Sequence, residues 1–526
     1  MPLATASGKN MPCKESPITS NNQDYAMKDR QLELGLKLYL PAPDCFGDFE
    51  KAVRIAADYG YDFIMLELGG AMEYKRHPEI NQGWLEYAAF MNEYPGKTLE
   101  IQHANRWAKN SIHTENGGGK VLSQEQIKQL IAICDKAGLE IFPEVPSLSH
   151  CDYLLTRHPE LAERDDDKYP DTACPSNPDY QRLIRDVLEE VIEVFHPKRI
   201  NICHDECYSI CKCPRCRGKV PHELYAEDIN NLASFLLQRG VTPFIWGEKL
   251  LDAHCLDGEP IGGAAIPDTP EQEGRASLYQ CGELIDKNVR ILHWYWSVDR
   301  NIEERYQQLG LQYWFGNTSL HQMQEAGRRL ASPNCKGIIV SNWGSTDLTT
   351  MQRNEVLYNL VYVSLATRQG QNPDDYETLD ALTRQHLYEL FRPKGDFIEV
   401  IHTTHTDLAF QFFFDGRYYR EKDYLMGHHV FSDENGTLYR FPVIFGTNIS
   451  NDTAKFGRFF NKAVNMDRLS CDMQLIEATG AALPIQAEDG KTYYKTRYAL
   501  PSPGLKLRYV RFEPASVFVP PVIVKG

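Results

Sequence analysis

The chain has 526 residues, of which 42% are hydrophobic and 24% charged, a composition typical of folded globular proteins. At this length we expect two domains, one of them large. The net charge of −16 argues against binding to nucleic acid or anionic membranes, which requires a positively charged surface. No apolar run is long enough to span a bilayer. The polar N-terminus lacks an apolar signal segment, so we expect a cytoplasmic protein, with a homo-oligomer left open.

Residues 1–30 are polar and predict a flexible tail. From there, short β-rich runs alternate with amphipathic helical patterns such as Gln124–Ala137 and Tyr180–Phe195, as in parallel α/β folds. The predicted strands are Leu34–Leu40, Asp62–Leu68, Leu139–Pro143, Arg199–Cys203, Thr242–Trp246, Arg290–Trp294, Gln312–Phe315 and Gly337–Asn342. Eight strands with helices between them predict a (β/α)8 TIM barrel over residues 31–399, with an open doubly wound sheet as the alternative.

Two further segments complete the predicted organisation. The insertion Gly69–Ser123 follows the second strand, and a loop of this length is expected to lie over the barrel mouth. Beyond residue 400, aromatic-rich alternating segments are separated by turn residues, which predicts a small β-sandwich-like domain over 400–526. These segments are Phe410–Phe414, Thr437–Phe445, Tyr493–Ala499 and Leu505–Phe512.

Aromatic and acidic residues follow the predicted strands, where barrel enzymes carry their active sites. Flat aromatic faces ringed by carboxylates are typical of a carbohydrate site. The alternative is that these aromatic rings merely cap the barrel. The candidate substrate-binding residues on this basis are Glu144, Trp246, Glu248, Trp294, Trp296, Tyr313, Trp314 and Trp343.

The fourth predicted strand leads directly into His204-Asp205-Glu206. Adjacent carboxylates repel one another, so we expect one of them to stay protonated near neutral pH. A protonated acid beside an ionised one suits glycosidic bond cleavage. Most Asp-Glu pairs are solvated surface, but the position after a buried strand favours Asp205 and Glu206 as catalytic residues.

Several segments resemble motifs of the glycoside hydrolase family 20 β-N-acetylhexosaminidases. Asn201-Ile202-Cys203-His204-Asp205-Glu206 resembles the family's His-x-Gly-Gly-Asp-Glu, and the segment from Phe142 to His150 resembles Pro-Glu-Ile-Asp-x-Pro-Gly-His. Phe244–Glu248 is similar to the family's Trp-x-Glu segment, and Asn342–Gly344 to its strand-8 tryptophan. The order and spacing of these segments agree over about residues 34–365.

The resemblance implies roles for individual residues. Glu206 would be the general acid/base, and Asp205 would hold the 2-acetamido nitrogen so that the acetamido oxygen attacks the anomeric carbon. Tyr313 would donate its hydroxyl to that oxygen, and Trp294, Trp314 and Trp343 would wall the pocket. His150 and Glu144 would support the site from strand 3, although His150 is equally well read as an ordinary loop residue.

The chain also departs from the family pattern. Strand 1 carries Lys37 and Tyr39 where the family has an arginine that grips sugar hydroxyls, and Cys203 and His204 replace the two glycines before Asp205. The strand-8 segment lacks the usual glutamate, with Asp347 as a substitute. These differences concern recognition of the outer hydroxyls and leave the acid pair intact.

Fourteen cysteines are present, and five of them lie between residues 203 and 216. The spacing of Cys207, Cys211, Cys213 and Cys216 predicts a structural zinc site of four thiolates, with free thiols as the alternative. Cys203 is a less suitable fourth ligand because it belongs to the strand. Four protein ligands leave no open position, so we expect the chemistry to need no cofactor.

The sequence therefore predicts a retaining glycoside hydrolase that removes terminal β-linked N-acetylhexosamine from an oligosaccharide or glycoside. Three alternatives remain. The barrel could be another glycosidase in which Glu206 pairs with Glu67, Glu144 or Glu248, a non-catalytic glycan-binding barrel, or a zinc-dependent hydrolase. The last is the weakest, because the predicted zinc site has no vacancy for water.

Overall fold

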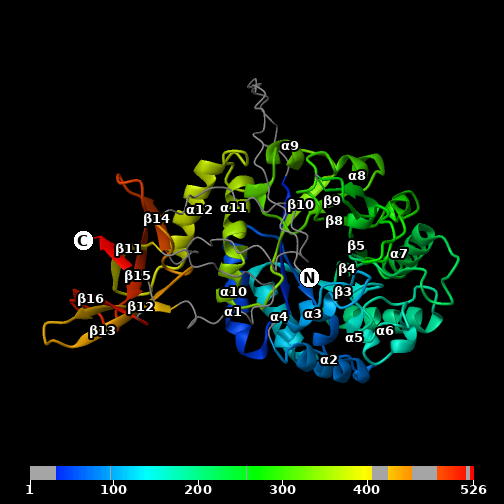
Figure 1. Ribbon diagram of the computed structural model, residues 1–526, viewed down its shortest axis with the longest axis horizontal. Helices are drawn as coiled ribbons and strands as arrows, with labels where there is room; N and C mark the ends of the chain where they lie inside the picture. Colours follow the sequence, from blue (N-terminus) through cyan, green and yellow to red (C-terminus); the bar gives the residue numbers. More distant parts are fainter. Residues whose placement is uncertain are drawn as a thin grey trace.

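The computed structural model describes residues 31–94, 96–255, 257–405, 425–452, 482–516 and 522–525. Eight parallel strands close into a barrel in the order β1-β10-β9-β8-β5-β4-β3-β2 (Figure 1). Their bounds are β1 Glu33–Tyr39, β2 Phe63–Glu67, β3 Glu140–Ser147, β4 Arg199–Cys203, β5 Thr242–Trp246, β8 Arg290–His293, β9 Tyr313–Phe315 and β10 Cys335–Ser341. The predicted TIM barrel is confirmed, and the open doubly wound sheet is wrong.

The barrel strands are buried on both faces, which is why their sequences are almost continuously apolar. One set of side chains fills the interior, including Phe63, Met65, Phe142 and Phe244. The alternate set packs outward against the helices. Gly35 faces the interior, where an added Cβ would lie 2.1 Å from the ring of Phe63, so this position has no room for a side chain.

Helices surround the barrel. Helix α4 has the predicted bounds and begins with a capping box between Ser123 and Gln126. Helix α6 begins before the predicted Tyr180, because Asn177 caps it and Pro178 occupies its first position. The helices are α1 Phe46–Asp58, α2 Pro78–Met91, α3 Lys97–Gln102, α4 Gln124–Ala137, α5 Asp152–Leu155, α6 Pro178–Phe195, α7 Pro221–Leu237, α8 Glu304–Gln308, α9 Ala326–Leu330, α10 Leu348–Arg353, α11 Val356–Thr367 and α12 Tyr376–Leu390.

The insertion after β2 contains α2 and α3 and returns over the ends of β1 and β2. Asn116 ties it there, because its Oδ1 accepts from the backbone N–H of Leu40 at 2.9 Å and its Nδ2 donates to the carbonyl of Glu67 at 3.0 Å. The insertion thus lies at the barrel mouth, as predicted. A second insertion, after β5, forms the short hairpin β6 Asp252–His254 and β7 Pro260–Gly262.

The C-terminal strands form two antiparallel sheets, which lie beyond α11 and α12 from the barrel (Figure 1). One has the order β14-β15-β11-β17 and the other β13-β12-β16, and both contribute to shared apolar clusters. The bounds are β11 Phe397–Thr404, β12 Leu425–Ser432, β13 Leu438–Ile444, β14 Ala482–Gln486, β15 Thr492–Ala499, β16 Arg508–Pro514 and β17 Val522–Lys525. The predicted boundary at residue 400 falls inside β11, while the predicted tail 1–30 and the segment Phe410–Phe414 lie outside the described residues.

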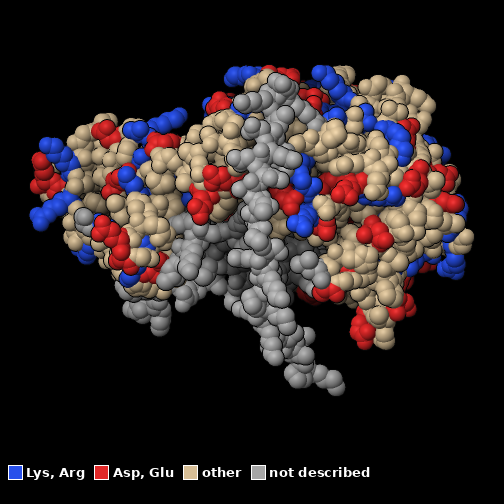
Figure 2. All heavy atoms as spheres, turned by 90° about the horizontal axis from the view of Figure 1, so that it is seen from above, with Lys and Arg blue, Asp and Glu red and all other residues tan. Residues whose placement is uncertain are grey.

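On the face shown in Figure 2, the Lys and Arg side chains of the described residues are interspersed with Asp and Glu side chains. In the same part of the chain, no helix combines the length and apolar character needed to cross a bilayer.

Candidate active site

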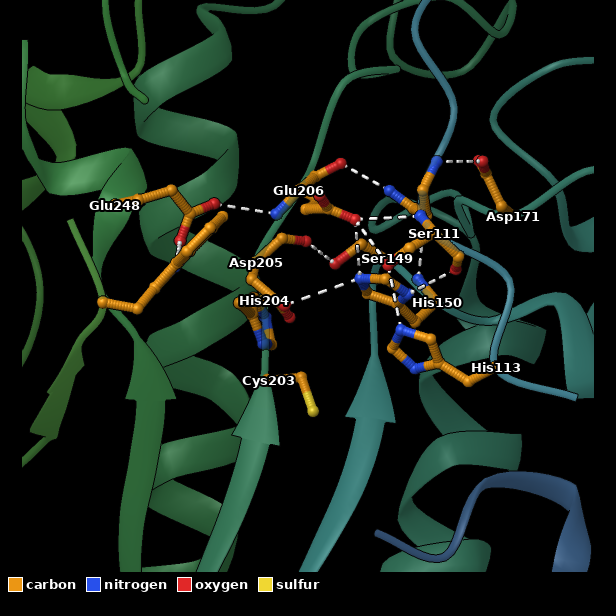
Figure 3. Close-up of polar contacts among 12 residues, drawn as sticks. Ser111, His113, Ser149, His150, Asp171, Cys203, His204, Asp205, Glu206 and Glu248 are labelled. Atoms are coloured by element: carbon orange, nitrogen blue, oxygen red, sulfur yellow. Dashed lines mark hydrogen bonds and ion pairs between the residues drawn. The ribbon is translucent and has the colours of Figure 1, made fainter. Parts of the chain in front are cut away.

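The loop after β4 carries Asp205 and Glu206 to the barrel mouth (Figure 3). Cys203, His204 and Glu206 adopt left-handed backbone conformations, with φ of 61°, 65° and 51°. The motif that this segment resembles has glycine at the first two of these positions. Here residues with a Cβ adopt the same kind of conformation, which costs on the order of 1 kcal/mol each and persists only where the surroundings hold it.

Buried hydrogen bonds at His204 hold the strained loop in place. Its Nε2 lies 2.9 Å from Oδ2 of Asp228 on α7, and its Nδ1 lies 2.9 Å from the carbonyl of Ile202. The hydroxyl of Tyr225, also on α7, donates to the carbonyl of His204 at 2.6 Å. His204 therefore anchors the acid pair to α7 instead of entering the site itself.

Glu206 is held by groups from four different segments. Its Oε2 accepts from the backbone N–H of Ser111 at 2.9 Å and from the hydroxyl of the same residue at 3.1 Å. Nε2 of His150 lies 3.3 Å from the same oxygen, and the hydroxyl of Tyr208 donates to Oε1 at 3.3 Å. The backbone N–H of Glu206 donates to Oε1 of Glu248 at 2.7 Å. These contacts fix both the backbone and the carboxylate of Glu206.

Asp205 has fewer partners than its neighbour. Its Oδ2 lies 3.5 Å from Nε2 of His150, and its carbonyl accepts a hydrogen bond from the hydroxyl of Ser149. Its Oδ1 is buried and has no hydrogen-bond partner among the described residues. Asp205 thus carries a desolvated acceptor at the end of β4, without a donor from the described part of the chain.

His150 and Glu206 shift each other's pKa in opposite directions. Nδ1 of His150 lies 3.1 Å from the carbonyl of Ser111, so Nε2 faces both carboxylates. Burial opposes the charge, but Asp205 and Glu206 raise the pKa of His150 well above its usual range. Burial also opposes ionisation of Glu206, yet His150 and the N–H of Ser111 lower its pKa to about 2. The lowered pKa means that Glu206 is not the member of the pair that stays protonated, because the histidine that follows β3 stabilises its charge.

Two other carboxyl groups of the mouth have raised pKa values. Burial is the main cause that raises the pKa of Glu144 to about 8, and the charge of Glu67 adds to it. Burial likewise raises the pKa of Glu248, whose oxygens accept from Glu206 and from Nε1 of Trp294, the latter at 3.0 Å. Glu144 and Glu248 therefore support the site as the candidate residues of β3 and β5, with Glu248 bonded directly to Glu206.

Lys37 forms a buried charge network beside the acid pair. Its Nζ lies 2.7 Å from Oε2 of Glu67 and 3.9 Å from Oε1 of Glu144. His113, from the insertion, lies 3.0 Å from the other oxygen of Glu67. Burial opposes the charge on Glu67, but Lys37 and His113 hold its pKa well below the usual range. This network occupies the place on strand 1 where the family motif has its arginine.

Three of the predicted tryptophans line the mouth. The Trp343 ring lies 5.9 Å from that of Trp246 and 6.1 Å from that of Tyr39, with Nζ of Lys37 3.3 Å above its centre. Trp294 packs against the same group and is partly exposed. Nε1 of Trp246 is buried without a hydrogen-bond partner in the described part of the chain. The mouth thus has aromatic walls and, among the described residues, an indole N–H without a partner.

Three predicted site residues lie elsewhere. The side chain of Tyr313 faces the helix layer, where its ring is 5.8 Å from that of Tyr306 on α8. Trp314 faces the interior, but its Nε1 donates to Glu33, the first residue of β1, at the opposite end of the barrel. Trp296 packs in the outer core and donates to the carbonyl of Gly316. Because successive strand residues point to opposite faces, Tyr313 and Trp314 cannot both line the mouth.

Sequence reasoning missed several residues that complete the site. Ser111 and His113 come from the long insertion, and the ring of His113 stacks on that of His150 with centroids 4.8 Å apart. Asn110 binds both the carbonyl of Glu206 and the backbone N–H of His150. Tyr208 follows the acid pair closely. For Ser111, His113 and Asn110, the sequence offered only the length of the insertion as a signal, because no local pattern marks which of its residues turn inward.

The cysteine cluster is assembled differently from the prediction. Ligand atoms of Cys213 and Cys216 converge with those of Cys174 and Glu163, all within 4.8 Å of one another. Cys207 and Cys211, which the spacing predicted as ligands, are not in this group, and Cys211 instead lies with its thiol 3.6 Å from the carbonyl of Lys219. The physical reason is that residues distant in sequence approach Cys213 and Cys216 more closely than their neighbours do.

Comparison with known proteins matches residues 81–272 to the family described as glycosyl hydrolase family 20, catalytic domain. A β-hexosaminidase of Akkermansia muciniphila is 24% identical over 228 residues, which are 40% of this chain and 42% of that protein. The resemblance indicated by the motifs is therefore confirmed for this part of the chain, which spans less than half the length of that relative.

Two solved structures are also similar. A β-N-acetylhexosaminidase from Bacteroides fragilis matches with 18% identity and a TM-score of 0.47, over 68% of this chain and 71% of that one. An exo β-N-acetylglucosaminidase of the same family from Vibrio harveyi, in complex with N-acetylglucosamine, matches with 16% identity and a TM-score of 0.46, over 69% and 58%.

Proposed function

We propose that this chain, whose residues 81–272 match the family 20 catalytic domain, hydrolyses terminal β-linked N-acetylhexosamine from oligosaccharides or glycosides with retention of configuration. The observation that carries the proposal is the unpaired, buried Oδ1 of Asp205 next to Glu206. A buried acceptor without a donor costs about 1–3 kcal/mol, which a ligand N–H directed at it would recover. The N–H of a 2-acetamido group is such a donor, and holding it turns the acetamido oxygen toward the anomeric carbon.

Glu206 is the proposed general acid/base, with His150 as its source of the proton. Nε2 of His150 lies 3.3 Å from Oε2 of Glu206, and its proton passes to Glu206 as the leaving oxygen approaches. The acetamido oxygen then bonds to the anomeric carbon while the glycosidic C–O bond breaks and the leaving oxygen takes the proton from Glu206. In the second step Glu206 accepts a proton from water, whose oxygen displaces the acetamido oxygen and restores the β configuration.

The surrounding residues support this use of the mouth. The faces of Trp343 and Trp294 suit the C–H surfaces of a sugar, and Nε1 of Trp246 is a donor that a sugar oxygen would satisfy. The names of the matched relatives, a β-hexosaminidase and a β-N-acetylhexosaminidase, agree with the same substrate class. The lysine network replaces the family's arginine, so we expect contacts to the outer hydroxyls to differ.

The alternative glycosidase would pair Glu206 with Glu67, Glu144 or Glu248. Each of these already contacts protein groups: Glu67 contacts Lys37 and His113, Glu144 contacts Asn201, and Glu248 contacts Glu206 and Trp294. The contact with Glu144 is a hydrogen bond of 2.9 Å that Nδ2 of Asn201 donates. Asp205 differs from these three glutamates because its Oδ1 has no hydrogen-bond partner among the described residues.

The test is a panel of chromogenic β-glycosides assayed with the wild type and three variants. We expect hydrolysis of N-acetylglucosaminides or N-acetylgalactosaminides only, and inhibition by a thiazoline mimic of the cyclised intermediate. Glu206→Gln and Asp205→Asn should each lose about 10²–10⁴-fold in kcat/KM. Tyr313→Phe is the matched control and should retain wild-type kcat/KM, because that side chain faces the helix layer.

Two results would overturn the proposal in different directions. Turnover of glucosides or galactosides lacking the 2-acetamido group would favour the other glycosidase. Sugar binding without hydrolysis across the whole panel would identify a glycan-binding barrel.

A further inference from the structure

A second cluster of reactive side chains lies between the segment that joins β3 to α6 and the loop that joins β4 to α7. Sγ of Cys174 lies 3.3 Å from Sγ of Cys213 and 3.3 Å from Sγ of Cys216, and the carboxylate of Glu163 completes the group. All four side chains are at most 9% exposed. Nothing in the proposed glycosidase chemistry uses them.

These contacts are not those of a disulfide. A disulfide joins two sulfurs at about 2.05 Å, and here three sulfurs share one small volume. Three thiols and a carboxylate this close together carry four ligand atoms and, when ionised, much negative charge. A bound cation would compensate that charge.

Glu163 supplies independent evidence for a cation. Its Oε1 accepts from the backbone N–H of Lys212 at 2.6 Å, so the carboxylate is fixed in orientation. Its Oε2 is fully buried and has no aligned hydrogen-bond donor in the described part of the chain, and the thiols are its neighbours. Burying a carboxylate oxygen without a donor is costly, and buried carboxylates in proteins are paired or coordinate metals.

We propose that Glu163, Cys174, Cys213 and Cys216 bind one zinc ion in a closed tetrahedral site. With zinc–sulfur bonds of about 2.3 Å, tetrahedral geometry places ligand sulfurs about 3.8 Å apart. The observed 3.3 Å requires each pair to open by only about half an ångström. Thiolate ligands with a carboxylate in a tetrahedral arrangement select zinc over magnesium or calcium, which prefer oxygen ligands. Metal binding displaces the three thiol protons to solvent.

The site joins the two loops that carry the catalytic groups. Cys213 and Cys216 belong to the loop that begins with Asp205 and Glu206, between β4 and α7. Cys174 and Glu163 belong to the loop between β3 and α6, where the backbone N–H of Cys151 bonds to the carbonyl of Asp171 beside His150. The metal would therefore cross-link the loop of His150 to the loop of Glu206, holding the pair at the distance that the proton transfer needs.

This assignment differs from the one that cysteine spacing suggests, and the two can be separated. Zinc is measured by elemental analysis after reconstitution of the 526-residue chain with zinc sulfate and exhaustive dialysis. We expect about one zinc per chain in the wild type, in Cys207→Ser and in Cys211→Ser. Cys174→Ser and Cys216→Ser should retain almost none, and Glu163→Gln should bind at least about tenfold more weakly.

Cobalt provides a second measurement that needs no ligand variant. Wild-type protein titrated with Co²⁺ should show the visible bands of a tetrahedral site together with a thiolate-to-metal charge-transfer band for three thiolates. Cys207→Ser, the matched control, should give the same spectrum.

Several results would overturn the proposal: a wild type that takes up no metal, a Cys174→Ser variant that keeps its zinc, a Cys207→Ser or Cys211→Ser variant that loses it, or a cobalt spectrum without tetrahedral thiolate features. None of these measurements uses glycoside turnover, so they remain decisive even if the proposed hydrolase activity is refuted.

Discussion

Replacement of His150 by glutamine should move the alkaline limb of the pH–rate profile to lower pH. In the wild type, we expect Glu206 and His150 to hold one proton between them, so activity at alkaline pH is lost when that proton leaves His150. Burial opposes the charge of His150, but Asp205 and Glu206 raise its pKa well above the usual range. In His150→Gln the proton must reside on Glu206 itself. Removing the cation raises the pKa of Glu206 from about 2, because burial then meets less opposition, although the N–H of Ser111 still lowers it.

The size of the effect follows from the geometry. Two unit charges 3.3 Å apart, as in this pair, interact by about 5 kcal/mol at an effective dielectric constant of about 20. That energy corresponds to about 3–4 pKa units, since one unit is about 1.4 kcal/mol. Solvent and the new amide recover part of it, so we expect the alkaline limb to move by at least about one unit, with kcat/KM at neutral pH reduced about tenfold or more.

The assay is kcat/KM between about pH 4 and about pH 10 with an N-acetylhexosaminide whose alkyl or sugar leaving group needs protonation. A substrate with a strongly acidic phenol as leaving group should be much less affected, because it departs without a proton. His158→Gln is the control, since His158 lies in the same β3–α6 loop but contacts Glu79 and Glu160. An alkaline limb that stays in place in His150→Gln, with the activity simply scaled down, would refute the shared proton.

Two further predictions concern the buried charges of the mouth. Glu144 has its pKa raised from 4.5 to about 8, chiefly by burial, so the folded state keeps a proton that the unfolded state releases. The stability of the wild type should therefore fall relative to Glu144→Gln as pH rises between these values, by up to about 1.4 kcal/mol per unit in urea unfolding, and a pH-independent difference would contradict this. Lys37→Met removes the lysine partner of Glu67, leaves His113 as its ion-pair partner among the described residues, and should cost about 3–5 kcal/mol. The double variant Lys37→Met/Glu67→Gln should recover most of that loss, and failure to do so would show that Lys37 acts through packing.

Local sequence patterns were sufficient for the barrel. The strands Arg199–Cys203 and Thr242–Trp246 and the helix Gln124–Ala137 have the predicted bounds, because apolar runs, amphipathic periodicity and capping residues act within a few neighbouring residues. The rule that catalytic side chains follow parallel strands then placed Asp205 and Glu206 at the mouth, as the structure does.

Which face a short strand presents was not decided locally. In β9, Tyr313 and Trp314 are both aromatic, and either register satisfies the apolar pattern. Only closure of the barrel put Tyr313 against α8 and Trp314 near Glu33, at the end away from the site.

The sequence by itself determined the elements and the position of the acid pair, while the tertiary structure decided the partners. Ser111 reaches Glu206 from an insertion far away in the chain, and Cys174 and Glu163 reach Cys213 from another loop. The same folding put His150 beside the acids, where it lowers the pKa of Glu206. The reason is that periodicity and spacing report interactions over a few residues, whereas charge states and ligand sets depend on distances set by packing the whole barrel.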